Sequence, residues 1–201
     1  MKNKKYFILL LHLSSVLVLL FYIFSLQQKI TKLEESYIRS SIVSPLIQFS
    51  FKIESLNNHL NEITNKREVT KNEIEEIKQL IQETSYNLNT FMNNYNTFVQ
   101  IEEHSFDDKV PNSRLLQIYN GIAVLQNNFG IQHEDSYKLA DHDLNLFIEY
   151  QKVTNYYKDT VNKYPKYWSD ESEENMKKLN NELKNGGWKD FLKELETLVI
   201  N

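Results

Sequence analysis

The chain opens with an apolar segment that is long enough to cross a membrane. Lys2, Lys4 and Lys5 come first, and residues 6–26 follow without a charged side chain. At 1.5 Å per residue, a helix of that length extends roughly 30 Å, the thickness of the hydrocarbon core of a bilayer. We therefore predict a transmembrane signal-anchor helix over residues 6–26, with the lipid bilayer as its partner.

A cleaved secretory signal has the same order of charged and apolar residues and is the main alternative. Its apolar core is about 7 to 15 residues long and precedes a cleavage site of small residues. The segment in this chain is longer and ends in Phe24-Ser25-Leu26-Gln27, without an Ala-x-Ala sequence. The length favours an uncleaved anchor, and secretion after cleavage near Ser25 stays the alternative.

Positive charges near the span predict its orientation, because lysine and arginine are enriched on the cytoplasmic side of membrane helices. Three lysines and the terminal amine crowd residues 1–5, whereas Lys29, Lys32 and Arg39 are spread along the other side. We expect a single-pass cell-membrane protein with a cytoplasmic N-terminus and an extracytoplasmic C-terminal domain. Arginine is scarce beside lysine and asparagine, which is typical of AT-rich bacterial sequences.

The part of the chain outside the anchor is acidic. Residues 1–26 hold three lysines and no acid, so the remainder has a formal net charge of −7, against −4 for the whole chain. Nucleic-acid binding depends on clustered lysine and arginine, and no basic run follows Lys5. We therefore expect no nucleic-acid partner. The chain has no cysteine, so neither a disulfide framework nor a lipid-modified cysteine is possible.

Scarce turn residues predict an all-α fold. The chain has only four glycines and three prolines, whereas a sandwich of short strands needs a turn about every 8 to 12 residues. We predict an extracytoplasmic antiparallel helical bundle with coiled-coil-like seams over residues 45–201. A stalk over residues 27–44 is expected to continue the membrane helix, and Pro45 to restart or kink the chain.

Apolar residues at alternating spacings of three and four predict the buried faces of four main helices. The second of these helices has a predicted start at Thr70, where Glu73 completes a capping box. It is expected to continue to about His104. The four seams are Leu46, Phe49, Ile53, Leu56, Leu60 and Ile63; Ile74, Ile77, Ile81, Thr84, Leu88, Phe91, Tyr95 and Phe98; Leu115, Ile118, Ile122, Leu125 and Phe129; and Leu139, Leu144, Phe147, Tyr150, Val153, Tyr157 and Val161.

Turn residues predict the boundaries of these helices. Residues 65–69 should join the first two as a helical hairpin, and a loop over residues 106–111 should follow. Gly130 is predicted to cap the third helix, and Pro165 to end a fourth over residues 135–164. The C-terminal tail is predicted as two short helices, residues 170–184 and 188–200.

No catalytic, cofactor or metal site is predicted. His133 and His142 are nine residues apart, so on a helix they point about 180° away from each other and do not converge on a metal. Acidic neighbours such as Glu102 and Glu103 diverge by about 100° on a helix and cannot flank one bond. The sequence has no Gly-rich phosphate loop and no Gly-x-Ser-x-Gly elbow. We therefore expect a protein that is not an enzyme.

Aromatic residues give the candidates for partner contact, because tyrosine and tryptophan concentrate binding energy at interfaces. They are Phe91, Tyr95, Tyr156, Tyr157, Tyr167, Trp168 and Trp188. Packing of the tail against the long helix is the alternative role for the C-terminal members. We expect a membrane-anchored interaction or scaffold module that binds another protein or a second copy of itself. The alternative is a ligand-sensing bundle that signals through a membrane partner.

Overall fold

The computed structural model describes residues 2–99, 109–132, 136–163, 173–184 and 189–196. Nearly all of these residues are helical, so the predicted all-α class is confirmed. The chain divides into two compact units, Met1–Ile38 and Arg39–Asn201.

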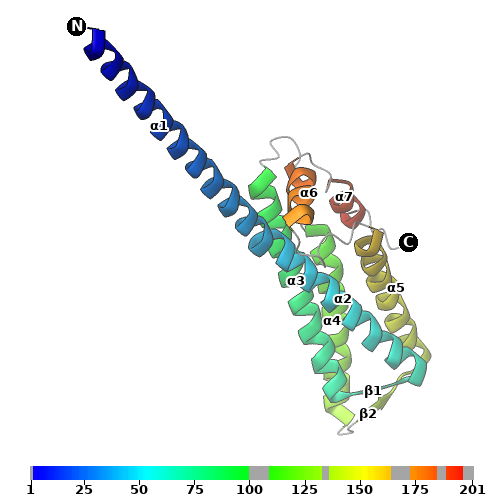
Figure 1. Cartoon of the computed structure of the whole chain (residues 1–201). Coiled ribbons are helices and arrows are strands. Elements are labelled where there is room, and N and C mark those ends of the chain that lie inside the picture. The colour runs from blue at the N-terminus through cyan, green and yellow to red at the C-terminus, as the bar shows by residue number, and fades with distance from the viewer. Residues whose placement is uncertain (1, 100–108, 133–135, 164–172, 185–188, 197–201) are drawn as a thin grey trace. The chain divides into compact units, whose positions relative to one another are not determined.

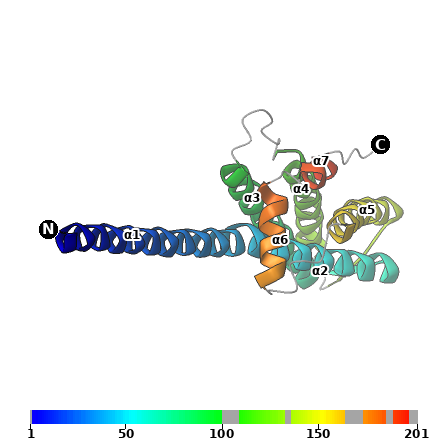
Figure 2. The same ribbon diagram turned by 45° about the horizontal axis from the view of Figure 1, so that its top comes forward.

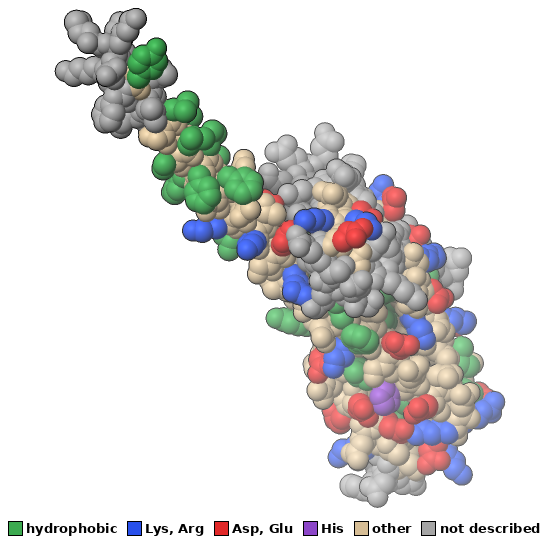
Figure 3. All heavy atoms as spheres, viewed as in Figure 1, with side chains coloured by type: hydrophobic (Ala, Val, Ile, Leu, Met, Phe, Trp, Pro, Cys, Tyr) green, Lys and Arg blue, Asp and Glu red, His purple; other side chains and the backbone are tan. Residues whose placement is uncertain are grey.

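The N-terminal unit is a single long helix, α1 (Lys2–Tyr37), drawn in blue in Figure 1. It has the length and the composition of a helix that can cross a membrane. Figure 3 shows hydrophobic side chains gathered along it. The hydroxyl of Ser15, which lies within the apolar segment, donates to the carbonyl of His12 at 3.0 Å, so this polar group is satisfied by the helix itself.

A π-helical segment, Ile38–Val43, follows α1 in the sequence, so the hydrogen-bond pattern changes after Tyr37 while helical structure continues to Ser44. The next α-helix has Pro45 in its first turn. Proline is tolerated there because the backbone N–H groups of a first turn have no partner within the helix. Pro45 therefore lies in the first turn of α2, directly after the π-helical segment, and Val43 before it also has helical backbone dihedrals.

The C-terminal unit is built from helices and one pair of short strands. α2 packs against α3 and α5, α3 packs against α4, and α7 contacts α4 and α5 (Figures 1 and 2). The strands lie at one end of the four long helices, and α6 and α7 lie toward the other end. The elements are α2 (Ser44–Lys66), β1 (Glu68–Thr70), α3 (Lys71–Val99), α4 (Lys109–Gln132), β2 (Ser136–Lys138), α5 (Asp141–Lys163), α6 (Glu173–Lys184) and α7 (Lys189–Glu196).

Polar side-chain contacts show the relative direction of α2 and α3. Lys52 lies 2.5 Å from Glu83, and the His59 Nε2 lies 3.3 Å from Glu76. The partner numbers fall along α3 as they rise along α2, so these two helices run in opposite directions.

α2 and α5 also run in opposite directions, as two polar contacts between them show. The hydroxyl of Thr154 donates to the side-chain oxygen of Asn57 at 2.8 Å, and both side chains are buried. Nearer the end of α5, Lys158 lies 3.6 Å from Glu54. A buried polar pair stabilises only when both members are satisfied, so this contact favours one register of α5 on α2.

The predicted seams form the core of the bundle. Every seam residue whose side chain is described is buried; Phe98 and Phe129 lie outside that set. The close approach of α4 and α5 depends on Gly121, because a Cβ at this position would lie 1.7 Å from the hydroxyl oxygen of Tyr150. Burial of the Tyr150 phenol raises its pKa to about 12, as expected for a ring enclosed by the core.

The strand pair was not predicted, and it corrects the start of the fourth helix. β1 and β2 pair antiparallel with Val69 opposite Tyr137, and α5 begins at Asp141 instead of residue 135. Val69 is fully buried, and the Leu139 N–H donates to the Arg67 carbonyl at 3.0 Å. This pairing joins segments about 70 residues apart, so no local pattern could predict it.

Two further boundaries differ from prediction. α4 begins at Lys109, so part of the predicted loop is helical, and Pro111 lies in the first turn, where proline is tolerated. The same helix continues through Gly130 to Gln132, so the predicted cap at Gly130 is wrong. A glycine ends a helix only where the following chain turns away, and here the helix continues. Residues 100–104, the start of the 106–111 loop and Pro165 lie outside the described residues.

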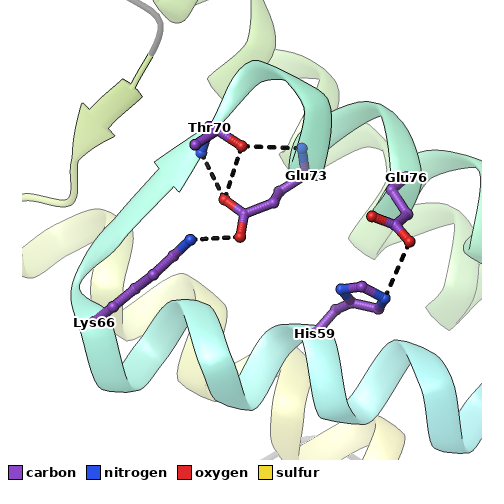
Figure 4. Close-up of polar contacts among 5 residues, drawn as sticks. All are labelled: His59, Lys66, Thr70, Glu73 and Glu76. Atoms are coloured by element: carbon purple, nitrogen blue, oxygen red, sulfur yellow. Dashed lines mark hydrogen bonds and ion pairs between the residues drawn. The ribbon is translucent and has the colours of Figure 1, made fainter.

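The predicted capping box at the start of α3 is confirmed (Figure 4). The Thr70 N–H donates to a Glu73 carboxylate oxygen at 2.8 Å, and the Glu73 N–H donates to the Thr70 hydroxyl at 3.2 Å. Lys66, from the last turn of α2, also donates to Glu73. Partial burial opposes ionisation of Glu73, but the hydrogen bonds from Lys66 and Thr70 outweigh it and lower the pKa of Glu73 below its usual 4.5.

Glu73→Gln tests the charge in this junction, because glutamine keeps an acceptor for Thr70 and removes the ion pair with Lys66. At neutral pH we expect a loss of up to about 1 kcal/mol in the free energy of unfolding. A carboxylate whose folded pKa is lowered stabilises the fold above its ordinary pKa and loses this effect as the pH falls. The difference from the unmodified chain should therefore shrink below pH 4.5.

Thermal unfolding of the full chain in detergent, followed by circular dichroism across that pH range, gives the comparison. Glu62→Gln, an exposed substitution in α2, controls for the loss of one negative charge. A difference for Glu73→Gln that stays constant into acid would contradict the assigned role of the charge.

Candidate partner-binding surface

Four of the seven predicted contact residues lie within the described chain, and three of them are in the core. Phe91, Tyr95 and Tyr157 have no exposed surface, whereas Tyr156 is half-buried. Tyr167, Trp168 and Trp188 lie outside the described residues. The buried rings cannot contact a partner while the bundle is folded.

Phe91 and Tyr95 pack where α3 meets α7. The ring of Phe91 contacts that of Phe191 from α7 edge to face, with centroids 5.9 Å apart, and lies 6.0 Å from the ring of Tyr95. Burial raises the pKa of the Tyr95 hydroxyl to about 12. Both rings are seam residues of α3, and seam residues are buried between helices of a bundle. Their position follows from the periodicity that also predicted the helix.

Tyr156 holds α7 against α5. Its hydroxyl donates to the Glu194 carbonyl at 2.6 Å, and Lys163 lies 3.2 Å from the Glu194 carboxylate. Its ring also lies 6.4 Å from that of Tyr157. For this residue the structure supports packing of the C-terminal tail against the long helix.

An exposed tyrosine of α3, Tyr86, lies between two hollows in the surface of the bundle. It is 70% exposed, and Leu116 of α4, which lines one of the hollows with it, is 57% exposed. The hollow toward α2 has a volume of about 530 Å³, and the hollow toward α4 about 390 Å³. We name the lining residues the Tyr86 surface: Lys52, Ile81, Gln82, Glu83, Ser85, Tyr86, Asn87, Asn89, Leu116 and Tyr119.

A charged pair borders the Tyr86 surface on the α2 side. Glu83 accepts hydrogen bonds from Lys52 and from the Gln79 amide, the latter at 2.8 Å, and these lower the pKa of its carboxyl group. Glu83 therefore stays ionised at neutral pH. Being partly exposed, the pair contributes little to stability, but fixed charges beside an aromatic side chain restrict which partners fit.

Polar contacts hold the α4 side of the Tyr86 surface in place. The Lys78 ammonium lies 5.6 Å from the centre of the Tyr119 ring and donates to the Gln126 side chain at 2.6 Å. The Gln82 amide approaches the Tyr119 hydroxyl at 3.4 Å. An outward aromatic ring with an apolar neighbour and a polar surround has the composition of a protein-binding site. Both hollows are open to solvent, whereas small-molecule sites bury most of their ligand.

Tyr86 is not among the predicted contact residues, because those were chosen for their aromatic character and not for their position relative to the seams. The heptad pattern of α3 predicts the exposure of Tyr86. Tyr86 falls between the seam positions Thr84 and Leu88, so the heptad pattern that buries those two residues turns Tyr86 outward.

No group of three or more His, Asp or Glu side chains is close enough to hold a metal ion among the residues that the structure describes. His142 lies in the first turn of α5, and His133 lies outside the described residues. The Asp143 carboxylate, next to His142, accepts a hydrogen bond from the Tyr137 hydroxyl at 2.8 Å. This bond raises the pKa of Tyr137 and connects β2 to α5.

No known protein family, curated protein sequence or solved structure matches the chain.

Truncation of single aromatic residues should separate the Tyr86 surface from the core. Tyr86→Ala should change the free energy of unfolding by no more than about 0.5 kcal/mol, because the ring is exposed. Phe91→Ala, on the same helix, should cost about 3 to 5 kcal/mol, because it leaves a cavity between α3 and α7. Thermal unfolding of the two variants in the same detergent gives the measurement. Equal losses for the two variants would show that Tyr86 is a packing residue.

Proposed function

We propose that the chain is a single-pass membrane protein whose helical bundle lies outside the cytoplasm and acts as a non-enzymatic interaction module. The opposed directions of α2 and α3 and of α2 and α5 support an antiparallel bundle. The Tyr86 surface is the proposed site of protein contact.

The exposed apolar surface of α1 is the observation that carries the anchoring. Its large hydrophobic residues from Leu13 to Phe24 are between 43% and 76% exposed. Leaving such side chains in water costs about 25 cal/mol for each Å² of apolar surface, whereas lipid solvates them. The 36 residues of α1 span about 54 Å, so roughly 30 Å can cross a bilayer and the rest can extend beyond it.

Charge supports the orientation. Lys2, Lys4 and Lys5 precede the span and favour a cytoplasmic N-terminus. The acidic remainder of the chain is then extracytoplasmic. Among the described residues on the face of the bundle shown in Figure 3, acidic and basic side chains are interspersed and form no large basic area, which suits a protein partner better than nucleic acid.

Single cysteines test the topology, because the chain has no native cysteine. Asn58→Cys, an exposed position on α2, should react in intact cells with a maleimide that cannot cross membranes. Lys4→Cys should react only after the cells are permeabilised. The reverse pattern would contradict the orientation, and release of the protein by alkaline extraction of the membranes would contradict the anchor.

Photo-crosslinking tests the interaction role. A benzophenone amino acid at Tyr86 should give a discrete adduct in intact cells, because aromatic positions at binding sites contact the partner directly. The same residue at Asp159, an exposed position on α5, is the matched control and should give little adduct. Leu116→Glu should suppress the Tyr86 adduct by placing a charge beside it. Equal adducts at the two positions would contradict a specific site.

A further inference from the structure

The part of α1 that follows the apolar segment has its own apolar stripe. Between Gln27 and Tyr37 the apolar residues are Ile30, Leu33 and Tyr37, and Leu26 precedes them at the same alternating spacing of four and three. Their side chains are between 39% and 71% exposed. We name Leu26, Ile30, Leu33 and Tyr37 the stalk seam. All the remaining positions from Gln27 to Ser36 hold polar or charged residues, so the stripe does not simply reflect a generally hydrophobic segment.

The residue types of the stalk seam match those of a two-stranded parallel coiled coil. Such coils favour a β-branched residue at heptad position a and leucine at position d. In this register Ile30 and Tyr37 are at a, and Leu26 and Leu33 are at d, so three of the four seam residues have the favoured type and Tyr37 does not. The same register continues into the apolar segment, with Val16 and Ile23 at a and Leu19 at d.

Charges beside the stalk seam specify the partner. Lys29 is at position g and Glu34 is at position e of the next heptad. In a parallel, in-register pair, position g of one helix lies beside position e five residues later on the other helix. Lys29 of each copy then faces Glu34 of the other. The two charges are therefore complementary for a second copy of the same sequence.

A membrane anchor imposes the same geometry. Two copies inserted with the same orientation have parallel helices, and the bilayer holds their apolar segments at the same depth, which keeps the stalks in register. We infer that two copies of this chain associate through the stalk seam as a parallel two-stranded coiled coil. This inference rests on the membrane anchoring proposed above and names a second copy as a partner.

A cysteine scan of the stalk in native membranes tests the inference. Ile30→Cys and Leu33→Cys should each place one thiol opposite the same thiol of the other copy. A disulfide needs about 3.5 to 4.5 Å between the two Cβ atoms. Gln28→Cys at position f and Thr31→Cys at position b, both exposed and outside the stalk seam, are the matched controls. After oxidation with copper phenanthroline, the disulfide-linked dimer should be several-fold more abundant for the first two variants. Equal yields at all four positions, or no dimer at any, would overturn the inference.

Charge exchange tests the parallel register. In the Leu33→Cys background, Lys29→Glu places two acids side by side in each of the two g–e pairs and should reduce the dimer several-fold. Glu34→Lys should do the same, and the double variant Lys29→Glu/Glu34→Lys should restore it. Lys32→Glu, the same change at position c, should leave the yield unchanged. Failure of the double variant to recover while the single variants reduce the dimer would overturn the register.

Alkaline extraction of the same membranes separates failure of the dimer from failure of the anchor. Protein that stays with the membrane but shows no seam-specific disulfide contradicts the dimer alone. Protein released from the membrane contradicts the anchor, and the cysteine pattern then decides separately whether the coiled coil forms. All substituted positions lie in α1, outside the unit that forms the bundle.

Discussion

The bundle depends on the apolar seam of α2, because this helix packs against both α3 and α5. Phe49, Ile53 and Leu56 on that seam have no exposed surface, and the ring of Phe49 packs edge to face on Tyr157 of α5, with centroids 6.1 Å apart. Apolar burial is not directional, so it holds the helices together without selecting one register. The hydrogen bond between Asn57 and Thr154 adds the direction that the seam lacks, since a shift of α5 along α2 would remove the Thr154 donor from the buried side-chain oxygen of Asn57.

Heptad periodicity correctly predicted the buried face of each helix, because the spacing of apolar residues determines which face packs against other helices. The described seam residues are buried, and the capping box of Thr70 and Glu73 formed as expected because both depend on neighbours within one or two turns. The pairing of β1 with β2 depends on contacts between segments that are distant in the sequence. Helix propensity and turn residues carry no information on such contacts, so the strand pair escaped prediction.

The candidate site could be predicted only in part, for the same reason. Aromatic character alone led to Phe91, Tyr95 and Tyr157, which the seam buries, and passed over Tyr86, which the seam turns outward. An aromatic ring can contact a partner only when it lies outside the apolar stripe that is buried between the helices. For this chain, the position of an aromatic residue relative to the seam therefore says more about binding than its identity does.

The same criterion distinguishes the seam of α2 from the stalk seam of α1. The first is covered by α3 and α5, whereas Ile30 and Leu33 remain more than half exposed. If a second copy covers the stalk seam, both bundles lie on the same side of the membrane and each carries a Tyr86 surface. A partner with two binding sites would then meet the second surface at a high effective concentration, so affinities that are modest for one bundle become strong for the pair. Dimerisation through the stalk would in this way increase binding without adding a contact to the bundle.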